Sequence, residues 1–371
     1  MSKTLQDYAT LINDTIQSNE INHYITTDNM CQNLGGIDTF KNINIPQGKV
    51  RSFQKDDVLL SNIRLYFRKV YRAKQKGGCS SDVLVFRAKH IDSATLFAIL
   101  SSQIFTDYAC SGSQGSKMPR GNKTHMMNFK IPTINFTITK IFNSIQNKIE
   151  NNHKINELLH KILELLYEQY FVRFDFLDEN NKPYQTSGGK MKFSKELNRL
   201  IPNNFEVKTL GELTQLKVGN KNANHSSNQG KYPFFTCSNN PLRCETYQFE
   251  GKHIIISGNG NFYVTHYDGK FDAYQRTYVV NPNNLNHYVL IYLFVKSYTN
   301  YLKLQSRGSI IKFITKSDIE NIKIVLPNLK TYAKWNNVLK MIENNNQSTQ
   351  TLTALRDFLL PLLLTQQVKP Q

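Results

Sequence analysis

The chain has 371 residues, of which 40% are hydrophobic, and these include 22 Phe and 19 Tyr. This apolar content excludes an intrinsically disordered chain, and the length predicts two or three domains with substantial cores. Lys and Arg number 46 against 28 Asp and Glu, which gives a net charge of +18. An excess of this size is typical of a protein with a polyanionic partner, nucleic acid first and an anionic membrane second.

The cysteines and the N-terminus bound the environment of the protein. Five cysteines (Cys31, Cys79, Cys110, Cys237 and Cys244) include no Cys-x-x-Cys pair, which predicts free thiols in a reducing compartment and no zinc site. No basic segment leads into an apolar stretch at the N-terminus, and nowhere do 18 uncharged apolar residues run together. We expect a cytoplasmic protein that does not associate with a membrane.

The predicted elements alternate between strands and helices along the chain. Short β-branched runs predict strands over 57–61 and 83–86, and a helical stretch follows near 93–105. After Pro132 the pattern changes to that of a long helix. The second half has the same order, with strands over 253–257 and 277–280, a helical stretch over 285–302 and a second long helix after Pro327.

The chain contains an internal repeat. Lys3-Thr4-Leu5 recurs as Lys208-Thr209-Leu210, and Gly115-Ser116 recurs 193 positions later as Gly308-Ser309. The same offset brings Asn128 onto Asn321, Lys130-Ile131 onto Lys323-Ile324, and residues 149–152 onto 342–345. We therefore predict two copies of an α+β unit, each ending in a long helix.

The two long helices carry apolar residues at alternating spacings of three and four, which is the a/d pattern of a coiled coil. The predicted seam positions are Ile138, Ile141, Ile145, Lys148, Asn152, Ile155, Leu159, Ile162 and Leu166, and then Val338, Met341, Asn345, Ser348, Leu352, Leu355, Leu359 and Leu362. We expect the helices to form an antiparallel coiled coil that separates the two units, with Asn152 and Asn345 fixing the register. The alternative is that each helix packs only on its own domain.

Sequence patterns dictated by catalytic chemistry are absent. The chain has no phosphate-binding Gly-x-x-x-x-Gly-Lys-Ser/Thr loop, no His-Glu-x-x-His, no Gly-x-Ser-x-Gly and no Asn/Asp-Pro-Pro-aromatic methyltransferase motif. The segment 257–261 (SGNGN) lacks the third glycine of a nucleotide-binding loop. We predict no catalytic residue and no bound metal or cofactor.

Basic residues beside Asn in the irregular parts of both units are the candidate DNA contacts. Lys and Arg contact phosphates, whereas Arg on guanine and Asn on adenine read base edges. The candidates are Arg64, Arg68, Lys69, Lys117 and Arg120 in the first unit, and Lys221, Asn239, Arg243, Asn259, Arg276 and Arg307 in the second. The alternative for each residue is a solvated loop position in a chain rich in Lys and Asn.

The middle of the chain resembles a known family. The segments EQYFVRFDF (168–176), NKPY (181–184), SGGKM (187–191), LIPN (200–203), FEVK (205–208) and LGEL (210–213) are similar to the central region of the specificity subunits of type I restriction-modification enzymes. The first copy departs from the Leu-Gly-Glu start, because it reads Leu5-Gln6-Asp7.

The resemblance implies a non-catalytic subunit for defence against phage. It implies two target recognition domains that each bind one half of a split site in double-stranded DNA. It also implies that the long helices set the gap between the two half-sites and bind two methyltransferase subunits. A restriction and translocase subunit completes the complex. S-adenosylmethionine, ATP and magnesium are then expected on the partners and not on this chain.

The domains implied are a first recognition domain over 1–132, a helix over 133–172, a connector over 173–208, a second recognition domain over 209–327 and a helix over 328–371. Three other functions stay open. They are the detached specificity part of a single-chain restriction enzyme, a self-sufficient DNA-processing enzyme, and a basic RNA-associated protein that binds without sequence preference.

Overall fold

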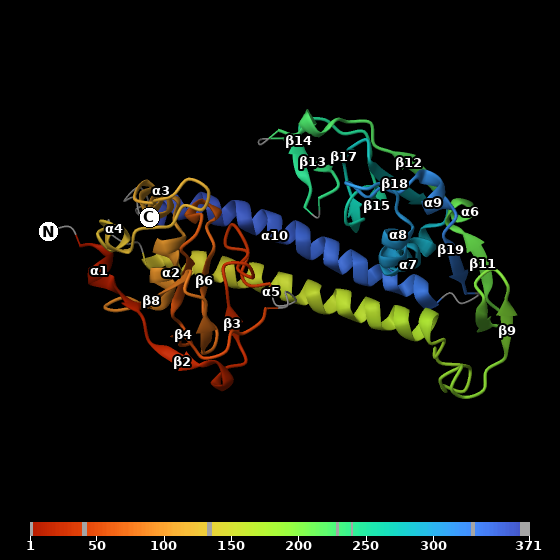
Figure 1. The fold of residues 1–371 in the computed structure, drawn as a ribbon, viewed down its shortest axis with the longest axis horizontal. Helices are drawn as coiled ribbons and strands as arrows, with labels where there is room; N and C mark the ends of the chain where they lie inside the picture. Colours follow the sequence, from red (N-terminus) through yellow and green to blue (C-terminus); the bar gives the residue numbers. More distant parts are fainter. Residues whose placement is uncertain are drawn as a thin grey trace. The chain divides into compact units, whose positions relative to one another are not determined.

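The structure, a computed structural model, describes residues 3–38, 43–131, 136–227, 230–238, 240–327 and 331–363. The chain divides into two compact units, unit 1 of residues 1–154 with 346–371 and unit 2 of residues 155–345. The division falls inside both long helices, α5 (Phe136–Tyr167) and α10 (Asn336–Leu363). Each unit therefore consists of one α+β lobe and one segment of each helix (Figure 1). Among the described residues, no helix is long and apolar enough to cross a membrane.

The lobe of unit 1 is built on a sheet with the strand order β1-β8-β5-β6. Its strands are β1 (Ala9–Ile12), β8 (Val83–Ala88), β5 (Val58–Ser61) and β6 (Val70–Arg72). A second sheet has the order β2-β4-β7-β3, with β2 (Thr15–Gln17), β4 (Lys49–Phe53), β7 (Gly77–Cys79) and β3 (Tyr24–Ile25). The helices of the lobe are α1 (Leu5–Tyr8), α2 (Ser93–Ser101), α3 (Gln103–Ser111) and α4 (Lys123–Met127), with short turns η1 (Ser18–Glu20) and η2 (Leu65–Phe67).

The central strands of this lobe bury both faces, which explains why they read as continuous apolar runs. Val58 and Leu60 on β5 face a core shared with α2 and α3, whereas Leu59 between them faces a smaller core beneath the second sheet. Leu84 and Val85 on β8 divide between the same two cores. Side chains on a strand alternate between faces, so one run of apolar residues supplies two cores.

The lobe of unit 2 repeats this arrangement. Its main sheet has the order β12-β18-β15-β16, with β12 (Thr214–Val218), β18 (Thr277–Pro282), β15 (Lys252–Ser257) and β16 (Val264–Asp268). Its small sheet has the order β14-β13-β17, with β14 (Leu242–Cys244), β13 (Tyr232–Phe235) and β17 (Asp272–Ala273). The helices are α6 (Leu210–Leu213), α7 (Tyr288–Ser297), α8 (Thr299–Gln305) and α9 (Lys316–Glu320), with the turns η4 (Ala223–His225), η5 (Leu285–His287) and η6 (Thr331–Trp335).

The predicted connector, residues 173–208, is folded into unit 2. It follows a π-helical turn, η3 (Glu168–Val172), and contains the hairpin β9 (Met191–Ser194) and β10 (Arg199–Pro202). The next strand, β11 (Glu206–Thr209), pairs with β19 (Lys323–Leu326). The rings of Phe176 and Phe205, which both belong to the connector, stack with 5.4 Å between centroids and lie in the main core of unit 2. Structurally, the connector is part of the second lobe and not a free linker.

The predicted repeat is confirmed at equivalent residues. The backbone N–H of Thr4 donates to the Asp7 carboxylate at 2.7 Å at the start of α1, and that of Thr209 donates to Glu212 at 2.6 Å at the start of α6. Both are capping boxes. The residue after each capping threonine donates its backbone N–H across the lobe, Leu5 to the Phe129 carbonyl and Leu210 to the Ile322 carbonyl, each at 2.8 Å. The two acceptors, Phe129 and Ile322, are 193 positions apart, which is the offset of the repeat.

The long helices pair antiparallel within each unit, as predicted. In unit 1, Asn152 Nδ2 donates to Thr349 Oγ1 at 3.1 Å, and in unit 2, Asn345 Nδ2 donates to Asn156 Oδ1 at 2.9 Å. Asn152 and Asn345 are equivalent in the repeat, and so are Asn156 and Thr349. The same polar contact therefore occurs once in each unit. The helices also pack on the lobes, for example through Phe142 against Phe97 in unit 1. Each helix therefore packs both on the other helix and on a lobe, so both predicted kinds of packing occur.

Half of the predicted seam is wrong. Ile138, Ile145 and Asn152 are buried as expected, but Ile141, Ile155, Ile162, Met341 and Leu355 are 42–51% exposed. The buried positions are instead one residue further along, at Phe142, Ile149, Asn156, Leu163, Ile342 and Arg356. Because a helix has 3.6 residues per turn, the residues three and four positions after a buried residue lie on either side of the same helix face. The lobe that also packs on the helix decides between them.

One buried contact distinguishes the two helix pairs. In unit 1, Arg356 is 1% exposed, and its Nη1 donates to Oε1 of Gln146 at 3.2 Å. The residues equivalent to these two in unit 2 are Leu339 and Leu163, both fully or almost fully buried. Unit 1 thus holds a charged hydrogen-bonded pair where unit 2 holds two leucines.

We expect Gln146→Leu and Arg356→Leu each to lower the free energy of unfolding by about 1–3 kcal/mol, because each leaves a buried polar partner unsatisfied. The double variant reproduces the pair of leucines found in unit 2 and should recover part of this loss, but the buried Leu34 carbonyl, which accepts from Gln146 Nε2 at 2.9 Å, stays without a donor. Urea unfolding of the four proteins forms a double-mutant cycle. If the double variant loses the sum of the two single losses, the contact does not act as a pair.

The lobe of unit 2 contacts its helices at a half-buried histidine, His160. Burial, with the charges of Lys296 and His266, lowers the pKa of His160 to about 4, against the opposing effect of Glu164. An unfolded histidine takes up its proton near pH 6.5. Between these values the unfolded chain binds the extra proton, so His160 should make unit 2 lose stability as the pH falls from about 6.5 towards 4.

His160→Gln should therefore flatten the dependence of the unfolding temperature on pH in this window. The control is His90→Asn, because His90 is exposed and has a positive φ of 62° that Asn tolerates. Thermal unfolding between pH 4 and 7 measures both. An unchanged slope in His160→Gln would show that His160 takes up its proton at an ordinary pH in the folded protein.

Candidate nucleic-acid interface

Each lobe carries a loop closed by the same backbone pairing. We call them glycine loop 1 (residues 113–121) and glycine loop 2 (residues 306–314). Gln114 pairs with Arg120 in the first and Arg307 with Phe313 in the second, and both loops turn at a glycine with φ near +98°, Gly115 and Gly308. Glycine adopts this conformation without steric cost, so the turn depends on it.

In unit 1, the fold brings three predicted DNA contacts together. Arg120 pairs with Ile63, and the backbone N–H of Arg64 donates to the Pro119 carbonyl at 2.9 Å. Lys117 is exposed on the loop, and its carbonyl accepts from Nη2 of Arg64 at 3.4 Å. Arg120 is 61% exposed and forms an ion pair of 2.9 Å with Asp82. Residues more than fifty positions apart thus form one basic surface.

In unit 2, the equivalent pairing gathers four predicted residues. Asn259 pairs with Phe313 of glycine loop 2, and Arg307 is 61% exposed beside Asp318 at 3.3 Å. The Arg276 carbonyl accepts from the N–H of Gly258 at 2.7 Å, and the Arg276 side chain is exposed. Lys221 pairs with Tyr274, two residues before Arg276. Lys221, Asn259, Arg276 and Arg307 therefore lie around one loop.

Two other predicted contacts in unit 1 are engaged with carbonyl oxygens of the lobe. The Arg68 side chain is 13% exposed, and its Nη2 donates to the Ser101 carbonyl at 2.9 Å and lies 3.8 Å from Asp357. Burial lowers the pKa of Arg68, against the opposing charge of Asp357. Lys69 is half-buried, and its Nζ donates to the Thr27 carbonyl. Both cations are therefore less available than Lys117 or Arg120, and their contact with DNA stays an untested prediction.

Two candidates remain, Arg243 on the small sheet of unit 2 and Asn239, which lies outside the described residues. Arg243 on β14 is exposed, but its guanidinium donates to the carbonyls of Gly230 at 2.9 Å and Lys231 at 2.8 Å. Arg243 is therefore better placed to hold the strand in position than to read a base.

Sequence reasoning missed the apolar residues of the glycine loops. Ile310 is 94% exposed and Ile311 62% exposed, and Met118 in glycine loop 1 is 56% exposed. Exposed side chains of this kind can contact thymine methyl groups or insert between base steps. The signal was present in the sequence, because Ile310 and Ile311 follow a glycine in a segment with neither helical nor strand periodicity.

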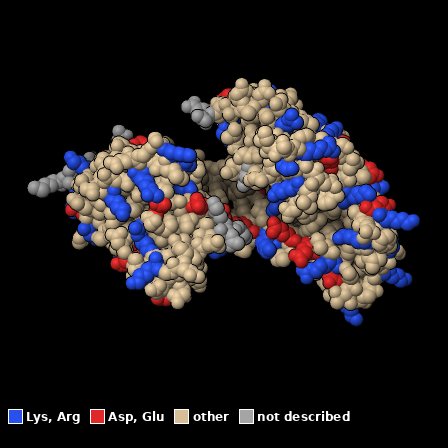
Figure 2. Space-filling model, viewed as in Figure 1, with Lys and Arg blue, Asp and Glu red and all other residues tan. Residues whose placement is uncertain are grey.

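Charge is spread over both units. On the face shown in Figure 2, Lys and Arg side chains are scattered over both lobes, and Asp and Glu side chains are fewer. This agrees with the net charge of +18, which is typical of a protein with a polyanionic partner.

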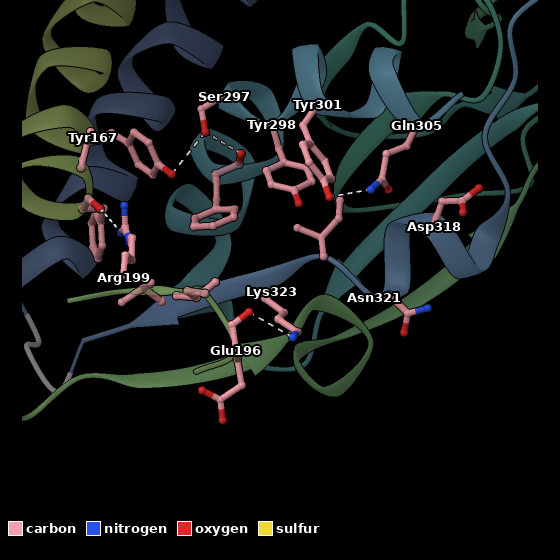
Figure 3. A pocket seen from close by; sticks show the side chains of 16 residues that line it. Tyr167, Glu196, Arg199, Ser297, Tyr298, Tyr301, Gln305, Asp318, Asn321 and Lys323 are labelled. Carbon is pink, nitrogen blue, oxygen red and sulfur yellow. Dashed lines mark hydrogen bonds between the residues drawn. The ribbon is translucent and has the colours of Figure 1, made fainter. Parts of the chain in front are cut away.

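Unit 2 also has a pocket of about 660 Å³, formed by the end of α5, the connector, α7, α8 and β19. Figure 3 shows Tyr298 and Tyr301 with their rings side by side and Lys323 donating to the Glu196 carbonyl at 3.1 Å. Its carboxylates are engaged in local contacts, Glu196 with Ser194 and Asp318 with Thr315. This arrangement holds the connector against the lobe and brings no nucleophile and base together.

Three comparisons with known proteins address the family. Residues 202–355 match the model of the type I restriction modification DNA specificity domain. The specificity subunit of the type I restriction enzyme EcoDI from Escherichia coli is 37% identical over 127 residues, which is 34% of this chain and 28% of that protein. The MjaIX specificity subunit from Methanocaldococcus jannaschii is 24% identical over 301 residues, 72% of this chain and 67% of that protein.

The fold matches a solved structure from end to end. The S subunit of a type I restriction-modification system from M. genitalium has a TM-score of 0.60 at 15% identity, with 98% of this chain and 96% of that chain covered. The fold of this chain is thus similar to that of the S subunit from M. genitalium, and residues 202–355 match the DNA specificity domain. These comparisons support an S subunit of a type I restriction-modification system, the family that the central segments of this chain resemble.

Proposed function

We propose that this chain recognises a bipartite site in double-stranded DNA, with one lobe for each half, and that it has no catalytic site of its own. The observation that carries this proposal is the equivalent position of the two glycine loops, each beside basic residues from a second segment of its lobe. Two copies of one binding surface on one chain suit two half-sites.

The residues at equivalent positions differ between the lobes, which supports two different half-sites. Arg120 in glycine loop 1 corresponds to Phe313 in glycine loop 2, and Met118 corresponds to Ile311. A guanidinium hydrogen-bonds guanine, whereas an apolar side chain contacts the thymine methyl group. The shared backbone then positions each loop, and its side chains select the bases.

The long helices are the proposed surface for partner subunits. Ile162 and Leu165 on α5 in unit 2 are 46% and 48% exposed. The residues 193 positions later, Leu355 and Phe358 on α10 in unit 1, are 44% and 67% exposed. Exposed apolar pairs at equivalent positions support two copies of one partner, and we propose methyltransferase subunits that bind S-adenosylmethionine. A restriction subunit that uses ATP and magnesium completes the complex.

The recognition proposal is tested with Arg120→Ala in unit 1 and Arg276→Ala in unit 2. The target is first obtained by comparing methylated sites in source cells with and without the gene. Each variant should then lose about 1–3 kcal/mol of discrimination at one base pair, in a different half for each variant. Binding to cognate and single-base variant duplexes at two salt concentrations measures this loss, with Lys192→Ala on β9 as the exposed basic control.

Uniform weakening on all sequences, with a salt slope reduced by about one, would make either arginine a phosphate contact. Loss of discrimination in the same half by both variants would contradict one lobe for each half. Methyl transfer by the purified chain alone would contradict a non-catalytic subunit.

The partner proposal is tested with Ile162→Glu and Leu355→Glu. Each should remove one of two methyltransferase copies from the co-expressed complex, because a charge replaces an apolar contact in one of two equivalent surfaces. Native mass spectrometry counts the copies. Gln350→Glu, exposed on α10, is the control, and retention of both copies in either test variant would exclude that surface.

A further inference from the structure

Three residues from distant parts of the sequence meet beneath the small sheet of unit 2. His225 ends the turn η4, Cys244 ends β14, and Asp272 begins β17. One donor atom from each lies within 4.8 Å of the others. Among the described residues, they form the one group of three or more His, Cys, Asp or Glu side chains with this geometry.

The burial of this group is unusual for its chemistry. The Asp272 carboxylate and the Cys244 thiol are both fully buried, and the His225 side chain is 25% exposed. Buried carboxylates are rare unless they are paired or bind a metal.

The hydrogen bonds present satisfy one carboxylate oxygen and not the other. Oδ2 of Asp272 accepts from the Thr246 hydroxyl at 2.5 Å and lies 3.2 Å from Nε2 of His225. Oδ1 of Asp272 is buried and has no hydrogen-bond partner in the described part of the chain. An unsatisfied buried carboxylate oxygen is less favourable than an unsatisfied neutral group. A bound cation would remove this cost.

We propose that His225, Cys244 and Asp272 form a zinc site. Zinc takes imidazole nitrogen, thiolate sulfur and carboxylate oxygen in a tetrahedral arrangement, so this donor set suits it better than a hard cation such as magnesium. The His225 side chain is 25% exposed, and we assign the fourth position to water. Burial and the neighbouring Asp272 raise the pKa of Cys244, and zinc binding would displace the thiol proton to solvent.

The site would tie together the three segments around the small sheet. The core beneath this sheet is small, with six buried residues against thirty-one in the main core of unit 2. A metal that joins η4, β14 and β17 would add the stability that so few apolar contacts cannot supply. The prediction of no zinc relied on the absence of Cys-x-x-Cys pairs, and the present ligands are too far apart in the sequence to give such a signal.

The test uses the full chain without an affinity tag, loaded with zinc and dialysed. Elemental analysis should give one zinc per chain, and chelation should lower the unfolding temperature of unit 2 until zinc is returned. Cobalt in place of zinc should give a thiolate charge-transfer band. Asp272→Asn, which keeps the shape of the side chain, should weaken zinc binding by about 100-fold or more, because even second-shell partners account for 10–100-fold.

Cys237→Ser is the matched control, because Cys237 lies in the same lobe and its thiol donates to the Arg276 carbonyl at 3.5 Å, outside the group. It should bind zinc like the unaltered protein. If Asp272→Asn does not fold, the metal content and the cobalt spectrum of the unaltered chain still show whether the zinc site exists. Absence of stoichiometric zinc, or a cobalt spectrum without a thiolate band, overturns the proposal, and neither result bears on DNA recognition.

Discussion

Both lobes depend on the pairing of two helix segments that lie nearly two hundred residues apart in the sequence. Each unit has a polar contact in this pairing, through Asn152 with Thr349 in unit 1 and Asn345 with Asn156 in unit 2. A buried amide accepts few alternative partners, so a shift by one turn would leave it unsatisfied. The role predicted for Asn152 and Asn345 is therefore to determine which residues of each helix face the lobe and which face solvent. The exposed apolar residues proposed for partner binding follow from that choice.

The repeat could be predicted because it resides in residues with local conformational roles. Thr4 and Thr209 begin helices, and Gly115 and Gly308 adopt a backbone conformation that other residues avoid. Such residues keep their identity when the surrounding side chains change. The helix seam was only half predictable, because spacings of three and four are both helical and the sequence does not show where the lobe packs.

The candidate site was predictable in composition but not in geometry. Arg120 and Arg276 were chosen for their charge, and the structure leaves them exposed beside the glycine loops. Arg68 was chosen for the same reason, yet it binds the Ser101 carbonyl inside the lobe. A sequence does not distinguish an arginine that caps a helix end from one that faces solvent. His225, Cys244 and Asp272 were missed because only the fold brings them together.

The division of the chain has a consequence for its synthesis on the ribosome. Unit 2 is one continuous stretch, residues 155–345, and its main core can assemble as soon as that stretch has emerged. Unit 1 is interrupted: Leu360 from the end of α10 packs in the same core as Leu5 and Phe142. The first lobe to be translated is therefore the last to complete its core, and it exposes that apolar surface while the whole of unit 2 is being made.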